Sequence, residues 1–555
     1  MKKQHWQLLL LSSLLLLSGC DLTSSSSAQS TEESSVESSK TSSSDTTSEA
    51  STSLLPPEDY ELDEMITNKD GSVYYEIFVR SFADSNNDGK GDLQGIASKI
   101  PYLKTLGVKG LWLTPIHPSP SYHGYDVEDY YGINKDFGTL SDFDHLITTA
   151  NNHNIDIIID LVLNHSSSTH PWYIEGRNRF RSGNYDANDP YDKANWYNFY
   201  WSGNNVKAAA VFGDWMPDLN LENPALREEI RAITHFWLDR GVKGFRLDAT
   251  SHFYPTDSGN VQFLEWFTNV VKEKRPDYYN VAEAWISFSR QKQYYNGIES
   301  LFNFNTAGSG GLFIDSITKG RGDVLGRDLE NYYADMREVN PEGLMSNFLS
   351  NHDMDRSSRM FLMDYEERQK LAASMYLLTP GVPFMYYGEE IGLKGSRGAA
   401  QTDADRRLPM IWQRVGDEDR TDVPPGTTYN MREQVQEGVK EGLETPFSLL
   451  NHYRKVINIR NRYPWFNFAD FTNLPLNSRQ LAAFKINDRD NKNDALYIVH
   501  NLHNDARSIS VSELGDIELY IDDELFTDGV RAEIVDDTLI IGKYSSVILK
   551  EKTNA

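Results

Sequence analysis

The chain of 555 residues has little cysteine and little positive charge. Its single cysteine, Cys20, excludes an intramolecular disulfide and any metal site built from several cysteines. The 54 Lys and Arg residues face 81 Asp and Glu residues, which gives a formal net charge of −27 at pH 7. Because a surface this acidic repels phosphate groups, we expect no nucleic acid as a partner.

Long apolar runs are scarce as well, and the one at the N-terminus is short. Lys2 and Lys3 precede an apolar run at residues 8–17, which predicts a secretory signal over residues 1–19. The sequence Leu-Ser-Gly-Cys that ends at Cys20 resembles the lipobox of bacterial lipoproteins, in which the cysteine becomes the lipidated first residue of the mature chain. The alternative is an ordinary signal peptide with an incidental cysteine. No later apolar run reaches 18 residues, so we expect no transmembrane helix.

Residues 20–53 are rich in Ser and Thr and contain no aromatic residue. Such a stretch cannot bury apolar surface, so it predicts a disordered linker. Together with a lipidated Cys20, it predicts an extracellular protein anchored to the bacterial cell membrane, with no other membrane contact.

The rest of the chain alternates between strand and helix patterns. Apolar runs typical of strands lie at residues 73–78, 108–113, 155–161, 242–247, 279–282, 301–304, 347–349 and 384–387. Helical patterns lie between most of them, for example at residues 140–151, 226–240, 261–274 and 367–378. This alternation over about 400 residues predicts a parallel (β/α)8 TIM barrel. An open doubly wound sheet would need a glycine-rich phosphate turn after its first strand, and the sequence lacks one.

Two further segments interrupt or follow the predicted barrel. Residues 166–216 are too long for a loop after the third strand and predict a small inserted domain. The barrel itself is assigned to residues 66–165 and 217–464. Short β-prone runs at residues 481–486, 495–499 and 539–541 then predict a C-terminal antiparallel β-sandwich domain over residues 465–555.

Four acidic residues fall at the carboxyl ends of predicted strands, where barrel enzymes build their sites: Asp160, Asp248, Glu283 and Asp353. Arg246 and Asp248 are two positions apart in a strand and therefore share a face, so the guanidinium is expected to lower the pKa of Asp248 and keep it ionised. An apolar neighbourhood with Trp285 is expected to raise the pKa of Glu283, as a general acid requires. Two such carboxylates about 5–5.5 Å apart are the machinery of a retaining glycosidase.

In their order and context, these acids resemble the conserved segments of the α-amylase superfamily of retaining glycoside hydrolases. The segments are residues 160–165, 244–252, 282–285 and 351–353, and the resemblance extends from about residue 68 to the C-terminus. It implies that Asp248 is the nucleophile, Glu283 the acid/base and Asp353 the stabiliser of the transition state.

The same resemblance implies a set of substrate-binding residues. They are Tyr125, which would stack on the sugar, and Asp126, His165, Arg246, His252 and His352. Residues 216–220 (Met-Pro-Asp-Leu-Asn) resemble the fifth conserved stretch of the intermediary α-amylases, between oligo-1,6-glucosidases and neopullulanases. Ala249 follows the nucleophile where α-1,6-specific relatives carry valine, which favours α-1,4 cleavage.

Residues 84–92 form an Asp- and Asn-rich loop with the spacing of an EF-hand-like calcium site. The oxygen donors would be the side chains of Asp84, Asn86, Asp88 and Asp92 and the carbonyl of Lys90. The bidentate glutamate of an EF-hand is missing, since Gly95 takes its place. The loop resembles a calcium loop found after the first strand in this superfamily; the alternative is a surface turn.

The sequence thus predicts retaining endo-hydrolysis of α-1,4-glucosidic bonds in starch, maltodextrins and related α-glucans, with calcium as cofactor. Two alternatives stay open: an exo-acting α-glucosidase or neopullulanase-like enzyme, and a non-catalytic carbohydrate-binding lipoprotein.

Overall fold

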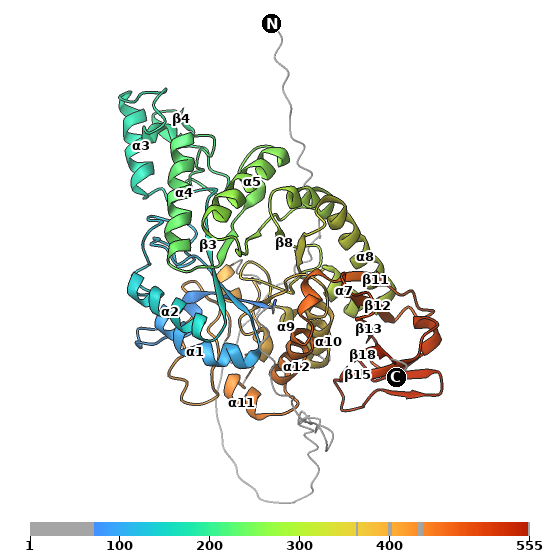
Figure 1. The fold of residues 1–555 in the computed structure, drawn as a ribbon. Helices are drawn as coiled ribbons and strands as arrows, with labels where there is room; N and C mark the ends of the chain where they lie inside the picture. Colours follow the sequence, from blue (N-terminus) through green and yellow to red (C-terminus); the bar gives the residue numbers. More distant parts are fainter. Residues whose placement is uncertain (1–71, 362–364, 398–401, 431–433, 436, 553–555) are drawn as a thin grey trace, which may run out of the picture. The chain divides into compact units, whose positions relative to one another are not determined.

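The computed structural model describes residues 72–361, 365–397, 402–430, 434–435 and 437–552 (Figure 1). The predicted signal segment, Cys20 and the linker lie outside the described residues. Within these ranges, no helix combines the length and the apolar character that a membrane span requires.

Eight parallel strands form the predicted barrel. They are β1 (Tyr74–Ile77), β2 (Gly110–Leu113), β3 (Asp156–Leu161), β6 (Gly244–Leu247), β7 (Val281–Ala282), β8 (Ser300–Phe302), β9 (Leu344–Ser346) and β10 (Phe384–Tyr386). The sheet order β10-β1-β2-β3-β6-β7-β8-β9 follows the chain except that β10 pairs with β1. The amides of Val382 and Phe384 donate to the carbonyls of Met345 and Asn347 at 3.0 Å, which joins β10 to β9 and closes the barrel.

One strand prediction was displaced along the chain. The apolar run at residues 347–349 was assigned to a strand, but β9 ends at Ser346. Phe348 and Leu349 are buried because they pack beyond the end of the strand, with Phe348 against Phe302 and Phe304. The apolar run at residues 347–349 therefore indicates burial at the end of the barrel and not pairing with a neighbouring strand.

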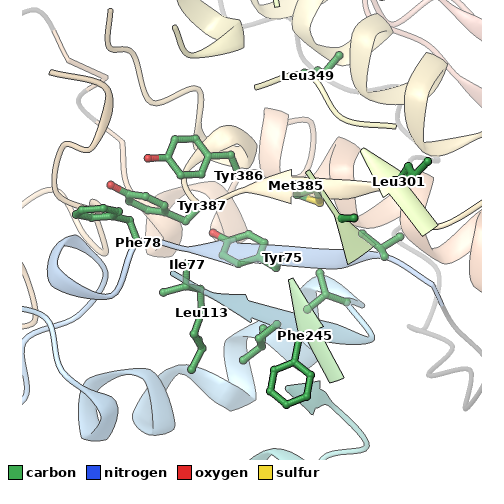
Figure 2. Packing of buried hydrophobic residues seen from close by; sticks show 14 of the residues in the cluster. Tyr75, Ile77, Phe78, Leu113, Phe245, Leu301, Leu349, Met385, Tyr386 and Tyr387 are labelled. Carbon is green, nitrogen blue, oxygen red and sulfur yellow. The ribbon is translucent and has the colours of Figure 1, made fainter. Parts of the chain in front are cut away.

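Side chains alternate between the inside and the outside of the barrel. A cluster of buried rings and aliphatic groups fills the interior; from the barrel strands it includes Tyr74, Trp112, Ile158, Val281, Phe302, Leu344 and Phe384. Strand residues that point outward, such as Tyr75, Ile77, Leu113 and Phe245, belong to a second cluster that reaches the surrounding helices (Figure 2). Burial on both faces explains why these strands read as continuous apolar runs.

Helices follow most strands, as predicted. The longer ones are α1 (Leu93–Leu106), α2 (Leu140–Asn152), α4 (Pro224–Asp239), α5 (Asp257–Lys274), α7 (Leu312–Lys319), α8 (Gly322–Val339), α10 (Tyr365–Leu377) and α12 (Leu449–Asn461). Short helices are α6 (Phe288–Gln291), α9 (Ser357–Met360) and α11 (Val439–Glu444). Side chains cap several starts: Asp92 accepts from the amide of Gly95 at α1, and Thr139 forms a capping box with Asp142 at α2.

The insertion after β3 has secondary structure of its own. It contains α3 (Pro171–Ser182) and a two-stranded antiparallel sheet of β4 (Phe199–Ser202) and β5 (Asn205–Ala208). Isolated bridges pair His165 with Asp218 and Tyr197 with Leu219, so the two ends of the insertion are tied together beside the barrel.

The C-terminal part is the predicted antiparallel β structure. One sheet has the order β11 (Asp470–Asn473), β12 (Leu481–Asn487), β13 (Ala495–Asn501), β18 (Ser546–Glu551), β15 (Leu519–Leu525); the other has the order β14 (Arg507–Ser510), β17 (Thr538–Ile541), β16 (Glu533–Val535). Val499 of the first sheet and Leu539 and Ile541 of the second share one core, as in a sandwich.

Candidate active site

A cleft of about 640 Å³ contains the three acids that the sequence singled out. It is lined by Tyr122, His123, Tyr125, His165, Phe212, Trp215, Met216, Asp248, Ala249, Ser251, His252, Glu283, Trp285, Asp353, Thr402, Asp403 and Arg407. Asp248 and Glu283 directly follow β6 and β7, and Asp353 follows β9, so the cleft lies at the carboxyl ends of the strands. Phe212, Trp215 and Met216 come from the insertion.

Arg246 of β6 forms ion pairs with several of these acids inside the barrel. Its guanidinium is buried, and Nη1 lies 2.8 Å from Oδ1 of Asp248 and 2.8 Å from Oδ2 of Asp160. Nη2 donates to Oε2 of Glu283 at 2.6 Å. One buried cation therefore binds three carboxylates, which offsets the cost of removing all these charges from water.

Asp248 and Glu283, the two acids that line the cleft beside Arg246, differ in pKa. Burial raises the pKa of Glu283 to about 7, against the lowering effect of Arg246. Burial also raises the pKa of Asp248, to about 6, so the expectation that Arg246 would hold it low is wrong in its net direction. Arg246 does lower it, but burial is the larger effect. Glu283 nonetheless has the higher pKa and takes the first proton, which leaves Asp248 ionised.

Trp285 has less effect on Glu283 than the sequence suggested. Its ring stacks on Phe304 at 4.5 Å, and the side chain is 52% exposed at the edge of the cleft. The raised pKa of Glu283 comes from burial, with further raising by Asp248 and Asp353.

The chain turns sharply between the two acids. Ala249 has a left-handed backbone with φ of 50°, which is rare for a residue other than glycine. This turn aims its amide at Oε2 of Glu283, at 3.1 Å, while Thr250 donates to the carbonyl of Glu283 at 2.9 Å. The left-handed turn thus locks the end of β6 to the end of β7.

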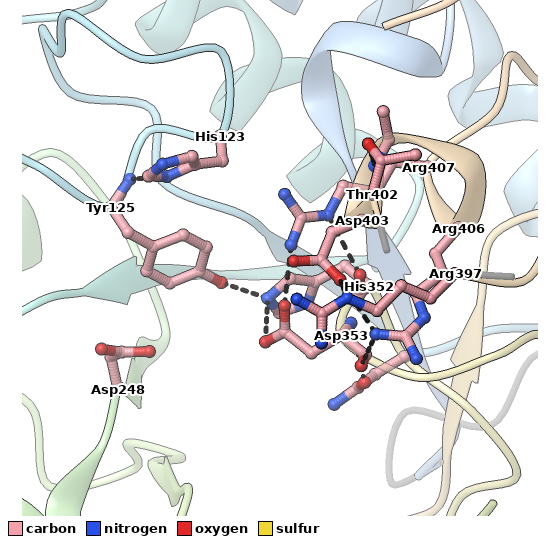
Figure 3. A network of polar contacts seen from close by, with 12 residues as sticks. His123, Tyr125, Asp248, His352, Asp353, Arg397, Thr402, Asp403, Arg406 and Arg407 are labelled. Carbon is pink, nitrogen blue, oxygen red and sulfur yellow. Dashed lines mark hydrogen bonds and ion pairs between the residues drawn. The ribbon is translucent and has the colours of Figure 1, made fainter. Parts of the chain in front are cut away.

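A second group of charges holds Asp353. Nε2 of His352 lies 2.9 Å from one carboxylate oxygen, and Nη2 of Arg407 lies 2.7 Å from the other (Figure 3). Burial alone would raise the pKa of Asp353, but His352 and Arg407 more than offset it and hold this pKa well below its usual range. Asp353 is therefore ionised at the pH values at which Asp248 and Glu283 titrate.

Tyr125 links the two groups. Its hydroxyl donates to Oδ2 of Asp160 at 2.9 Å and lies 2.7 Å from Nε2 of His352, and its ring stacks on that of His352 at 5.3 Å. His165 lies behind it, with Nε2 3.2 Å from the Tyr125 carbonyl, and burial lowers the pKa of His165 to about 4. His165 is thus neutral above about pH 4.

The remaining predicted binding residues differ in position. His252 lines the cleft, edge-on to Phe212 at 5.4 Å. Asp126 does not line it: the carboxylate is buried and accepts from the hydroxyls of Ser119, at 2.7 Å, and Ser121. Asp126 therefore holds the loop that carries Tyr125, and its contact with the substrate stays a prediction.

Several charged residues of the site were missed from the sequence, among them Glu76, Asp403 and Arg407. Glu76 of β1 is buried, and its Oε1 lies 2.6 Å from Nδ1 of His352. A lone acid inside an apolar strand was the available signal. Arg407 comes from a loop beyond the last strand, and its neighbours in sequence carry no pattern that marks it.

The Asp-rich loop folds around its own carboxylates. Asp84 accepts from the amides of Asn87 and Gly89 at 2.8 and 2.7 Å, and Asp88 accepts from the amide of Lys90 at 2.9 Å. Asp92 caps α1. The donors are all oxygens, as calcium prefers, so the residues fit that ion in type. Across the described ranges, however, no three His, Cys, Asp or Glu side chains gather into a metal site.

Because both ring nitrogens of His352 face carboxylates, Glu76 is expected to act as a positioning residue. Burial alone would lower the pKa of His352, yet Asp353 and Glu76 raise it to about 10. Glu76→Leu should therefore lower kcat by about tenfold or more, which corresponds to about 1.4 kcal/mol or more in the barrier, with little change in KM. Glu76→Gln, which keeps an acceptor, should recover part of the loss.

Glu299→Gln is the control, since this glutamate precedes β8 at the opposite end of the barrel and holds the amide of Asn280 at 2.7 Å. It should change stability but not kcat. A Glu76→Leu variant with wild-type kcat and a lowered melting temperature would show that Glu76 is only structural.

Comparison with known proteins agrees with this geometry. The family model for the alpha-amylase catalytic domain matches residues 76–468. Alpha-amylase 3 of Dictyoglomus thermophilum is 36% identical over 493 residues, which cover 86% of this chain and 93% of that protein. An oligo-1,6-glucosidase of Halalkalibacterium halodurans is 29% identical over 75% of this chain and 87% of its own.

A solved structure is similar as well. Eubacterium rectale Amy13B matches with a TM-score of 0.81 and 34% identity, over 88% of this chain and 97% of that one. The family model covers most of the chain, and the acids of its barrel meet in one cleft. The chain therefore belongs to the alpha-amylase family and is a glycoside hydrolase that acts on α-glucans.

Proposed function

We propose that the enzyme hydrolyses internal α-1,4-glucosidic bonds of starch-like glucans and retains the anomeric configuration. The observation that carries the proposal is the bridge of one guanidinium between Asp248 and Glu283. Such a bridge keeps the carboxylates close together, which suits the separation of about 5–5.5 Å in retaining enzymes better than the roughly 6.5–9.5 Å of inverting ones.

The order of the two pKa values supports the roles that the resemblance to the α-amylase superfamily implies. Asp248, ionised first, attacks the anomeric carbon, while Glu283 protonates the leaving glycosidic oxygen. Glu283, now a carboxylate, then removes a proton from water, and this water releases the sugar from Asp248. Asp353, held ionised by His352 and Arg407, stabilises the positive charge that develops on the sugar ring.

Three observations support α-1,4 endo-cleavage. The most similar curated relative described above is an alpha-amylase, and Ala249 follows the proposed nucleophile. Exposed Trp215 and Trp285 line the cleft, where they offer ring faces to several sugars. The relative named oligo-1,6-glucosidase favours a second candidate, an exo-acting α-glucosidase or neopullulanase-like enzyme.

Calcium at residues 84–92 and attachment through a lipidated Cys20 are also part of the proposal. The alternating oxygen donors of the loop support the first. The lipobox-like sequence that ends at Cys20, followed by a Ser/Thr-rich stretch, supports the second and an extracellular, membrane-anchored enzyme.

The pKa order predicts a narrow, bell-shaped dependence of kcat/KM on pH. Activity requires ionised Asp248, so it falls as pH drops through about 6; it requires protonated Glu283, so it falls as pH rises through about 7. Initial rates on a soluble maltodextrin between pH 4 and 9 test this. A kcat/KM that stayed constant up to pH 9 would exclude Glu283 with a pKa near 7 as the general acid.

Early product analysis separates the two candidate activities. Endo-cleavage of amylose should give mixed maltooligosaccharides and a rapid fall in viscosity while less than a tenth of the bonds are cut. Isomaltotriose should be cut at least about tenfold more slowly than maltotriose, a difference of about 1.4 kcal/mol in the barrier. Glucose as the sole early product, or faster cleavage of isomaltotriose, would contradict the proposal.

Removal of calcium should lower the melting temperature. When the free calcium concentration is 100 times the Kd of the loop, binding adds about 2.7 kcal/mol to the free energy of unfolding. Chelation should therefore lower the melting temperature by several degrees, and added calcium should restore it. Asp88→Ala should abolish the response, whereas Asp516→Ala, in the C-terminal part, should keep it. An identical melting curve with and without chelator would remove calcium from the proposal.

A further inference from the structure

A second pocket, of about 550 Å³, lies in the insertion. It is lined by Phe180, Tyr185, Ala187, Asn188, Pro190, Ala194, Asn195, Tyr197, Asn198, Phe199, Asn220, Glu222, Asn223 and Pro224. None of these residues lines the catalytic cleft. Its size is within the roughly 300–1,000 Å³ of pockets that bind small ligands.

Aromatic rings form one wall of this pocket. Tyr185 stacks on Phe180 with centroids 5.5 Å apart, Phe180 lies 5.6 Å from Phe199, and Phe199 lies 5.6 Å from Tyr197. Phe180 and Phe199 are half-buried and Tyr197 is buried, but Tyr185 is 37% exposed. The row of rings therefore ends in one accessible ring at the surface.

Exposed rings are concentrated in this part of the chain. Six of the ten exposed aromatic side chains found in the described ranges lie between residues 185 and 215. Phe212 and Trp215 belong to the catalytic cleft, while Tyr185 belongs to the second pocket. A concentration of exposed apolar surface on a folded protein marks a binding surface.

The polar groups at the pocket suit a neutral ligand with many hydroxyls. The side-chain amides of Asn188 and Asn198 and the hydroxyl of Tyr185 have no hydrogen-bond partner among the described residues. Each is exposed and able to donate and accept. Glu222 is the single carboxylate in the lining, and no lysine or arginine is present there. An anionic ligand would therefore find no counter-charge.

The loop that carries Tyr185 and Asn188 is held in place. Arg179 donates to both oxygens of the buried Asp192 at 2.8 and 2.6 Å, and the amide of Asp186 donates to the same carboxylate at 3.0 Å. Asn195 donates to the carbonyls of Asp186 and Asp189 at 2.8 Å. A loop fixed in this way loses little entropy when a ligand binds.

We propose that this pocket is a second binding site for the α-glucan chain, separate from the site of hydrolysis. The apolar face of a glucose ring stacks on Tyr185, and its hydroxyls bond the amides of Asn188 and Asn198. This inference rests on the proposed function, since it takes the polymer cut in the cleft as its ligand. Stacking on one ring binds a sugar weakly. When the same long glucan chain also occupies the cleft, the second contact forms within one complex at a high effective concentration, and this raises the overall affinity for the polymer.

The test uses two exposed tyrosines. Tyr185→Ala removes the ring of the pocket, and Tyr520→Ala removes a ring of similar exposure, 39%, from β15 of the C-terminal sheet. In a Glu283→Gln background, which leaves the polymer uncut, Tyr185→Ala should weaken retardation in a gel containing amylopectin at least threefold, and Tyr520→Ala should not. Asn188→Ala provides a second pocket variant if Tyr185→Ala is unstable.

In the active enzyme, Tyr185→Ala should lower kcat/KM for starch while kcat/KM for maltotetraose stays at the wild-type value. Equal retardation of the Tyr185→Ala and Tyr520→Ala proteins would overturn the second site, as would an equal loss of activity on starch and maltotetraose. Failure of the wild-type enzyme to cut starch would instead refute the proposed function, because retardation is measured without cleavage.

Discussion

The active site depends on the burial of one guanidinium. Arg246 is almost completely inaccessible to solvent and lies 4.9 Å over the ring of Trp112, with Asp160, Asp248 and Glu283 on its nitrogens. Three carboxylates this close would repel one another and take up protons without a cation between them. With Arg246 present they stay close together, and burial still raises the pKa of Asp248 and Glu283 enough for them to share one proton near neutral pH.

The barrel supplies this arrangement through the two-residue period of its strands. Tyr74 lies two positions before Glu76, and Ile158 lies two positions before Asp160, so these two strands each carry an apolar inward residue and then a charged one. The interior is thus apolar in the middle and charged at the end where the cleft opens. The left-handed turn at Ala249 then directs Asp248 and Glu283 toward the same space.

Much of this could be predicted from the sequence because strand ends and motif residues are local features. The barrel, the insertion and the C-terminal sheets followed from local patterns. The grouping of Asp248, Glu283, Asp353, Arg246 and His352 followed from strand-end positions together with the resemblance to the α-amylase superfamily. What failed depends on distant contacts. The net pKa direction at Asp248 needed the extent of its burial, which contacts from the whole barrel determine. Glu76 and Arg407 are 276 and 55 residues from His352, which both contact.

The central claim is that Asp248, ionised beside Arg246, forms the covalent bond to the sugar. Mass spectrometry of the Glu283→Gln variant after reaction with an α-maltosyl fluoride tests it directly, because the good leaving group needs no acid and the covalent intermediate then lacks a base for its hydrolysis. We expect one added maltosyl group on the peptide that contains Asp248. Label on another residue, or turnover to the inverted anomer with no covalent adduct, would contradict the account.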